Sequence, residues 1–244
     1  QVGSGSGGSV TLANSGTVDV QSGVLNYASG TGSSTGTFSV AAGATYQTGG
    51  ATMVFEAGSV LTAAGTVSIT SGSTTVNLAN FTAANLSLSG GTLTATGNLT
   101  VSGAYTQTGG TLNGGGTLTL TGTGNTWSGS FSTWTGDGTV VVASGAALTL
   151  SGTGGGNVFG GRTLQIDAGG DVTVSGRIEL DAGTNAIVNA GTLTLSGTEM
   201  THLYSSVGTL ALTNSGTLVK AGAGTFQVGS GSGGSVTLAN SGTV

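Results

Sequence analysis

Residues 1–18 read QVGSGSGGSVTLANSGTV, and residues 227–244 repeat these letters without one substitution. Position 227 is therefore the equivalent of position 1. Self-similarity at a fixed period is the signature of a repeat protein. We expect residues 1–226 to form one tandem-repeat unit and residues 227–244 to open the next identical unit, in one continuous architecture without a separate domain.

The composition differs from that of an ordinary globular domain. Charged residues make up 5% of the 244 residues, against about a quarter in a typical domain, and 51 positions are Gly. Disorder is not expected, because the hydrophobic content is 36%, the mean hydropathy is +0.29 and the net charge is only −5. The absence of Pro favours unbroken strand ladders. The absence of Cys excludes disulfides and thiolate metal sites, and it fits an exported protein.

Charge and hydropathy also exclude two classes of partner. The fixed positive charges are Arg162, Arg177 and Lys220, too few for a patch that would bind the phosphate backbone of a nucleic acid. No apolar run approaches the roughly 18 residues of a transmembrane helix. The sequence therefore predicts neither a nucleic-acid partner nor a membrane span.

A Gly-Thr-hydrophobic step recurs along the chain, as in residues 116–118, and Arg162 replaces the Gly in one step. Ten such steps divide the unit into nine intervals, each of roughly 25 residues. Within the strands, Thr alternates with Leu, as in residues 192–195, which places one set of side chains inside and the other outside. We predict an all-β fold, a parallel β-helix (β-solenoid) of about nine coils of about 25 residues per unit.

Six of the eleven charged residues cluster in one segment. They are Arg162, Asp167, Asp171, Arg177, Glu179 and Asp181. Asp167 and Asp171 flank a glycine turn and are the candidates for a Ca²⁺ site, but the repeated GGxGxD pattern of calcium-binding β-helices is absent. We favour outward-facing charges that pair between adjacent coils, and we predict no catalytic residue and no cofactor-binding residue.

Aromatic residues gather in residues 125–134, which contain Trp127, Phe131 and Trp134. Their rings could stack on sugars or make lateral contacts, or they could fill the solenoid interior, and we favour the interior because aromatic side chains contribute most to burial. His202 and Tyr204 lie in the least repetitive stretch and complete the possible adhesive or lateral-contact patch. A metal site at His202 is not expected, because too few further ligands are near it in the sequence.

Residues 218–228, LVKAGAGTFQV, resemble the autotransporter-associated β-strand repeat. The Asn-Ser-Gly-Thr-Leu and Gly-Thr-Leu-Thr-Leu steps elsewhere are similar to passenger domains of autotransporters and to filamentous-haemagglutinin-like adhesins. The resemblance implies export, a right-handed parallel β-helix, a place outside the cell or on a bacterial cell surface, and service as an adhesin or stalk.

These observations favour a non-enzymatic structural protein, a long extracellular or cell-surface fibre whose partners are further copies of its own unit in the same chain. Lateral association with identical solenoids is a further possibility. The alternative is an adhesin that binds a carbohydrate, a cell surface or ice through aromatic or Thr-rich faces such as Thr92/Thr94 and Thr117/Thr119. A polysaccharide-cleaving β-helix is a remote alternative, because clustered catalytic carboxylates are missing.

Overall fold

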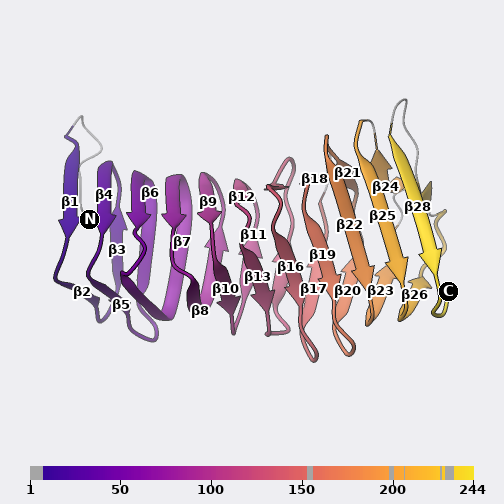
Figure 1. The fold of residues 1–244 in the computed structure, drawn as a ribbon, viewed down its shortest axis with the longest axis horizontal. Helices are drawn as coiled ribbons and strands as arrows, with labels where there is room; N and C mark the ends of the chain where they lie inside the picture. The colour runs from indigo at the N-terminus through magenta and orange to yellow at the C-terminus, as the bar shows by residue number, and fades with distance from the viewer. Residues whose placement is uncertain (1–7, 153–155, 198–200, 206, 226, 229–233) are drawn as a thin grey trace.

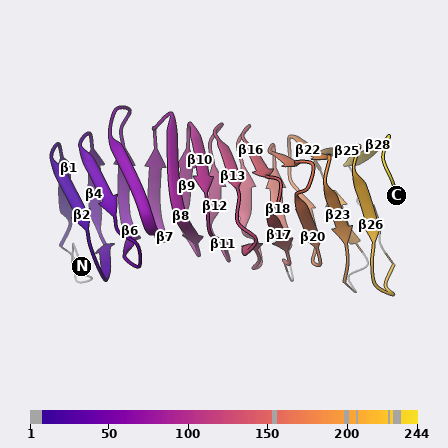
Figure 2. The ribbon, with the colours of Figure 1, turned by 90° about the horizontal axis from the view of Figure 1, so that it is seen from below.

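The computed structural model describes residues 8–152, 156–197, 201–205, 207–225, 227–228 and 234–244. Its strands belong to one 28-stranded sheet that winds along a single long axis, and every pairing within it is parallel (Figures 1 and 2). The described residues contain no helix. The strands are β1 (Val10–Asn14), β2 (Thr17–Val20), β3 (Val24–Tyr27), β4 (Gly30–Ser34), β5 (Thr37–Val40), β6 (Thr45–Phe55), β7 (Val60–Val76), β8 (Asn80–Leu88), β9 (Thr92–Ala95), β10 (Asn98–Val101), β11 (Tyr105–Gln107), β12 (Thr111–Asn113), β13 (Thr117–Leu120), β14 (Asn125–Trp127), β15 (Thr133–Thr135), β16 (Thr139–Val142), β17 (Ala147–Leu150), β18 (Asn157–Gly160), β19 (Thr163–Ile166), β20 (Asp171–Val174), β21 (Ile178–Leu180), β22 (Thr184–Asn189), β23 (Thr192–Leu195), β24 (Thr201–Ser205), β25 (Thr209–Asn214), β26 (Thr217–Lys220), β27 (Gln227–Val228) and β28 (Ser235–Asn240).

Each coil of the solenoid has three extended segments, so the molecule has three faces. Most segments are separate strands, but β6, β7 and β8 each run through more than one face. Face 1 starts at β1 and continues through β4, the second half of β6 and the end of β7 to β9, β12, β15, β18, β21, β24 and β27. Face 2 starts at β2 and continues through β5, the first parts of β7 and β8, β10, β13, β16, β19, β22, β25 and β28. Face 3 starts at β3 and ends at β26, which bridges to Thr243.

The predicted parallel β-solenoid is confirmed, with about ten turns and stacked residues about 21 positions apart. The sequence-based estimate of nine coils per unit is therefore about one coil too low. The reason is that the Gly-Thr steps do not stay on one face. Thr37 lies on face 2 and pairs with Thr17, whereas Thr66 lies on face 3 and pairs with Thr45. The interval between Thr37 and Thr66 consequently spans four strands instead of three.

Alternation along each strand builds the core. In β23 the side chains of Leu193 and Leu195 are buried while Thr192 and Thr194 are half-buried on the outside, and most strands repeat this pattern. Corners between faces need glycine where coils stack closely. A Cβ on Gly216 would lie 2.2 Å from the carbonyl oxygen of Gly191 in the coil below, so no larger residue fits without moving the backbone. Leucine, valine and aromatic side chains thus form one continuous interior along the axis.

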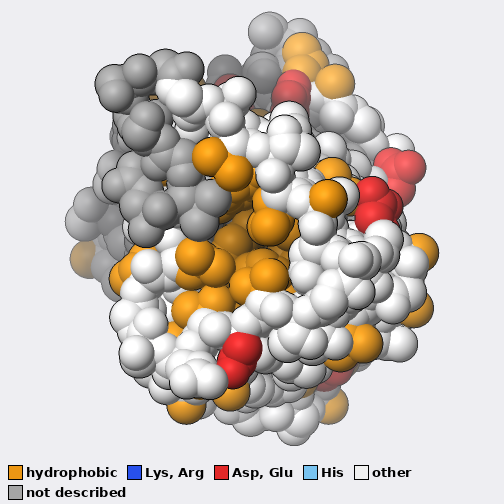
Figure 3. All heavy atoms as spheres, turned by 90° about the vertical axis from the view of Figure 1, so that its left-hand side faces the viewer, with side chains coloured by type: hydrophobic (Ala, Val, Ile, Leu, Met, Phe, Trp, Pro, Cys, Tyr) orange, Lys and Arg blue, Asp and Glu red, His pale blue; other side chains and the backbone are white. Residues whose placement is uncertain are grey.

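The end of this interior is visible at the first coil. Seen from the N-terminal end, hydrophobic side chains fill the centre and are surrounded by polar atoms (Figure 3). Val10, Leu12, Val18 and Leu25 belong to this coil and are only partly buried, although they pack against the core. The same kind of residue is fully covered inside the stack, where Leu118 is 2% exposed. Each coil therefore depends on its neighbours to bury its apolar side chains.

Candidate functional site

The charged segment contains one residue that lies in the interior of the solenoid. Arg162 points inward and is 1% exposed. Its Nε donates to the carbonyl oxygen of Thr135 at 3.0 Å, and its Nη2 donates to the carbonyl oxygen of Gly114, two coils away. Burial lowers the pKa of the guanidinium to about 10, so Arg162 remains charged at neutral pH. A Cβ on Gly138 would lie 2.7 Å from Nη2, so this glycine leaves the room that the guanidinium occupies.

The prediction that these charges face outward and pair between adjacent coils is wrong for Arg162, which is buried. Arg177 and Glu179 form an ion pair at 3.3 Å, but both belong to the same coil, where β21 begins. Arg162 pairs with backbone carbonyls rather than with a carboxylate. On face 1, Glu179 stacks directly on the uncharged Val158 of the coil below.

Asp167 and Asp171 do not converge on a metal site. The Asp167 carboxylate accepts a hydrogen bond from Gln165 Nε2 at 2.7 Å, and its backbone carbonyl accepts one from the Gly170 amide, which closes a turn. Asp171 opens β20 with an exposed side chain stacked on Ala147. In the described part of the chain, no group of three or more His, Asp and Glu side chains could hold a metal ion. The geometry of Asp167 and Asp171 therefore gives the Ca²⁺ site no support.

The two tryptophans lie inside the solenoid. Trp127 of β14 and Trp134 of β15 are both 0% exposed, and their rings stack with centroids 3.9 Å apart and planes 9° apart. Phe159 of β18 packs against both rings at centroid distances of 6.5 and 6.0 Å. The tryptophans are therefore core residues, and they cannot belong to the possible adhesive patch.

Phe131, another member of that patch, lies at the surface and does not join the tryptophans in the interior. Phe131 is 68% exposed and holds a left-handed φ of 59°, a conformation that is costly for a residue with a side chain. It borders a small depression with Val158, Glu179 and Leu180. His202 and Tyr204 lie in β24, and their side chains are outside the described part of the structure.

A buried polar network surrounds Trp134 and was not predicted. The indole Nε1 donates to Gln107 Oε1 at 2.6 Å and to the Tyr105 hydroxyl at 3.2 Å, and the Tyr105 hydroxyl donates to Gln107 Oε1. The Gln107 amide donates to the carbonyl oxygens of Gly110 and Thr133. Burial raises the pKa of Tyr105, so its hydroxyl stays protonated. The network satisfies polar groups that would otherwise be costly in the interior.

A second polar feature, which we call the asparagine ladder, consists of Asn189, Asn214 and Asn240 at the ends of β22, β25 and β28. Asn189 Nδ2 donates to Asn214 Oδ1 at 2.6 Å, and Asn214 Nδ2 donates to Asn240 Oδ1 at 2.7 Å. The first two Nδ2 groups also donate to a carbonyl across the corner, of Thr217 and Thr243 respectively. A shared sequence pattern could have identified these three residues as equivalent, because each Asn is followed by Ser or Ala and then by Gly and Thr.

A long surface feature is a column of hydroxyl side chains on face 1, which we call the hydroxyl ladder. Its members stack in register on seven successive coils and are exposed or half-buried. They are Thr11, Thr31, Thr52, Ser73, Thr92, Thr111 and Thr133. Neighbouring hydroxyls recur at the coil spacing of ~4.8 Å, and no charged residue lies on these seven strands. The arrangement offers a neutral row of hydrogen-bond donors and acceptors.

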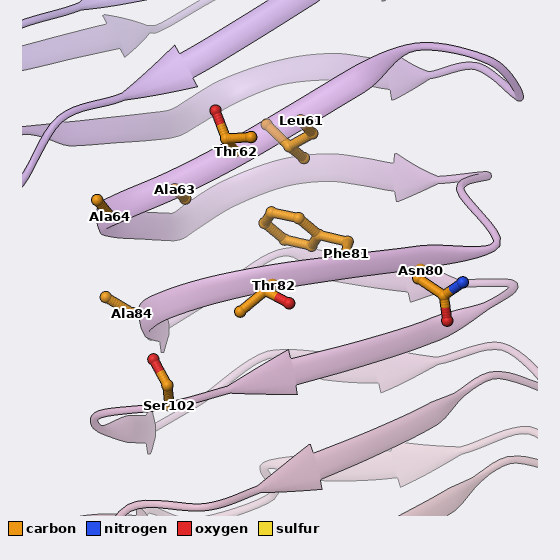
Figure 4. Close-up of a pocket in the computed structure, with 9 residues that line it drawn as sticks. All are labelled: Leu61, Thr62, Ala63, Ala64, Asn80, Phe81, Thr82, Ala84 and Ser102. Atoms are coloured by element: carbon orange, nitrogen blue, oxygen red, sulfur yellow. The ribbon is translucent and has the colours of Figure 1, made fainter.

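A depression lies on face 2, next to the corner with face 3 (Figure 4). It has a volume of about 610 Å³, and Leu61 and Phe81 contribute apolar side chains to it, while Ala64, Ala84 and Ser102 lie at the corner. These corner side chains are small, which is why the surface is hollowed there. The lining contains no titratable group, so it offers shape but no acid–base chemistry.

Comparison with known proteins gives no match to a family model, to a curated protein or to a solved structure. In the described residues, no helix has the length and apolar character needed to cross a bilayer. The chain is a parallel β-solenoid with a repeated sequence, an architecture that suits a structural or adhesin-like protein.

Proposed function

We propose that this chain is a segment of a long, non-enzymatic fibre or stalk outside the cell, in which solenoid units follow one another without interruption. The observation that carries the proposal is the position of the second copy. Strand β28, which belongs to residues 227–244, stacks in register on β25 over six residue pairs and prolongs the solenoid. The repeat therefore adds coils to the same stack instead of starting a separate body.

The chemistry of the chain supports the same proposal. Function in a stalk requires length and inertness, and the chain combines a continuous backbone ladder with 5% charged residues. The resemblance of residues 218–228 to autotransporter-associated repeats agrees with an exported stalk. In the described ranges, the depressions and the charged segment supply no arrangement that would favour catalysis.

Electron microscopy of chains with one, two and four units tests the proposal. About ten coils at ~4.8 Å predict a stiff rod that lengthens by roughly 50 Å for each added unit. Separate beads joined by linkers, or a length that does not scale with the number of units, would contradict it. Limited proteolysis supplies a second measurement, with cleavage confined to exposed corners.

A second candidate function, adhesion, is favoured by the hydroxyl ladder. A row of neutral hydroxyls at regular spacing can hydrogen-bond a neutral polysaccharide or a layer of ordered water. The aromatic alternative loses support, because Trp127 and Trp134 are fully buried.

The adhesion candidate is tested with Thr92→Lys, which places a charge in the middle of the hydroxyl ladder. Binding to neutral polysaccharides and thermal hysteresis in ice should fall at least tenfold if the ladder is the adhesive face. Thr213→Lys on face 2 is the matched control, because Thr213 is exposed and stacks between Val188 and Ala239, outside any row of hydroxyls. Equal activity in both variants, or none in the unmodified protein, would rule the adhesive ladder out.

A further inference from the structure

The two copies of the repeated sequence do not lie on the same face. Residues Val10–Asn14 form β1, the first strand of face 1. The identical residues 236–240 lie in β28, which pairs with β25 and belongs to face 2. The next segment agrees: Thr17 pairs with Thr37 on face 2, whereas its equivalent Thr243 bridges to Thr217 on face 3. The second copy is therefore displaced by one strand relative to the first.

The corners show why one sequence can serve at two places. At the corner between faces 1 and 2, Asn14 Nδ2 donates to the Thr37 carbonyl at 3.0 Å, and the amides of Thr35 and Gly36 donate to the Asn14 carbonyl. At the corner between faces 2 and 3, Asn214 Nδ2 donates to the Thr243 carbonyl at 3.1 Å. The amides of Ser241 and Gly242 likewise donate to the Asn214 carbonyl. The two corners have the same hydrogen-bond pattern, so the repeated segment fits either.

The asparagine ladder joins one unit to the next in this displaced position. Asn240 is the equivalent of Asn14, and Asn14 donates from Nδ2 to Ser34 Oγ at 2.9 Å in the following coil. Continued from one repeat unit into the next, the column of hydrogen-bonded side chains runs through Asn189, Asn214 and Asn240 and then reaches the serine equivalent to Ser34. The displacement thus continues a buried hydrogen-bonded column across the junction, where side-chain amides would otherwise lose their partners.

We propose that each repeat unit turns the faces of the solenoid by one position, so that successive units are related by a rotation of one third of a turn. From β1 to β28 the chain passes through ten full coils and one further strand. At ~4.8 Å per coil the rise is about 50 Å per unit. Three units therefore return the sequence to its first face after about 31 coils, or about 150 Å.

The rotation has a consequence for the surface of a fibre, and this step rests on the proposed function. The hydroxyl ladder lies on face 1 in one unit, on face 2 in the next and on face 3 in the third. A fibre built in this way presents the same neutral hydroxyl row toward three sides.

Paired cysteines in this chain test the rotation, and the absence of native Cys removes any background. In-register neighbours on parallel strands are ~4.8 Å apart, within the Cα separation that disulfides tolerate. Ala211→Cys with Thr237→Cys joins register partners on face 2, and both positions are exposed. Tyr204→Cys with Thr237→Cys joins the positions that would be neighbours if the second copy returned to face 1. Ala186→Cys with Ala211→Cys is the control for reaction efficiency.

We expect the 211/237 pair to oxidise as completely as the 186/211 control and the 204/237 pair to stay reduced. Oxidation of 204/237 in place of 211/237 would overturn the rotation and leave the continuous fibre intact. If the control oxidises and neither test pair does, the second copy does not stack on the solenoid, and both proposals fail. A helical reconstruction of a chain of several units gives an independent measurement, a one-third turn for each rise of about 50 Å. A reconstruction without that turn would equally overturn the rotation.

Discussion

Two regions of the solenoid bury polar side chains in different ways. The tryptophan section, around β11 to β19, holds Tyr105, Gln107, Trp134 and Arg162, each of which makes its own set of contacts with partners in other coils. The asparagine ladder, at the ends of β22, β25 and β28, uses one residue type with the same two contacts in successive coils. The contacts of the tryptophan section are particular to its coils, whereas the contacts of the asparagine ladder can be repeated in every further coil.

The difference bears on two needs of a repeat protein: its coils must stack in one register, and each new unit must join the previous one. A ladder of identical amides gains a partner with every coil that is added, and Asn189 Oδ1 at its start is a buried oxygen without a hydrogen-bond partner. The tryptophan section gains nothing from repetition, because its side chains have different shapes. It fixes the register of its coils, since Trp134 and Arg162 each reach partners 27 residues or more away. We infer that the tryptophan section fixes the register of the coils within a unit and that the asparagine ladder joins one unit to the next.

The largest expected effect comes from breaking the tryptophan section. Trp134→Ala removes the stacked ring and leaves Gln107 Oε1 without its indole donor. Large-to-small changes of this kind cost about 3–5 kcal/mol in the free energy of unfolding. Denaturant unfolding measures the loss. Trp134→Phe is the matched variant, because it keeps a ring and should lose markedly less; equal losses would show that the ring itself contributes little.

The next effect is a dependence of the free energy of unfolding on alkaline pH. The asparagine ladder cannot produce it, because asparagine side chains do not titrate. Burial raises the pKa of Tyr46 to about 12, and it raises the pKa of Tyr105 as well. In the unfolded chain these hydroxyls ionise near pH 10, so above that pH the two tyrosines hold more protons in the folded state and their contribution to stability falls. Arg162, whose pKa is lowered to about 10, contributes in the opposite direction above pH 10. Below pH 10 the contribution is constant. For Tyr46, two pKa units correspond to a loss of about 3 kcal/mol by pH 12.

Unfolding measured from pH 7 to 12 checks this dependence. Tyr105→Phe should flatten part of the slope, and it leaves Gln107 Oε1 with its donor from Trp134. Tyr46→Phe should flatten another part. A slope that neither variant changes would assign the alkaline loss to other groups.

The third effect tests the asparagine ladder. Asn214→Ala removes one of the two acceptors of Asn189 Nδ2 and the donors to Asn240 Oδ1 and to the Thr243 carbonyl, which should cost about 2 kcal/mol in unfolding free energy. Asn98→Ala is the control, because Asn98 donates to Asn80 at the exposed surface and its loss should be within about 0.5 kcal/mol. Similar losses in the two variants would mean that the ladder has no special role.

The sequence was informative where alternation and composition decide the structure. Thr and Leu alternate in β23, and this period identified strands, an apolar interior and a Thr-bearing surface. The coil count failed because the Gly-Thr step marks corners of more than one face, as Thr37 and Thr66 show. Only the register between coils separates the faces, and register is a property of stacking that one strand does not encode.

The buried polar residues were harder to predict. Arg162 replaces a Gly in the Gly-Thr series, and its charge favoured a surface position on general grounds. Its burial depends on Gly138, which leaves space, and on carbonyls of Gly114 and Thr135, which lie near it only after coiling. The interior position preferred for Trp127 and Trp134 agrees with the structure, but their stacking and the role of Gln107 need the fold.

The smallest expected effect comes from a polar contact at the surface, with which both buried regions can be compared. Arg177 and Glu179 form an ion pair at 3.3 Å with side chains 30% and 27% exposed. An ion pair with this exposure contributes about 0–1 kcal/mol and is screened by salt. Arg177→Gln should therefore change the free energy of unfolding by less than about 1 kcal/mol, and the difference should vanish in high salt. A loss as large as that of Asn214→Ala would place the charged segment among the structural elements of the unit and remove the contrast between buried and surface polar groups.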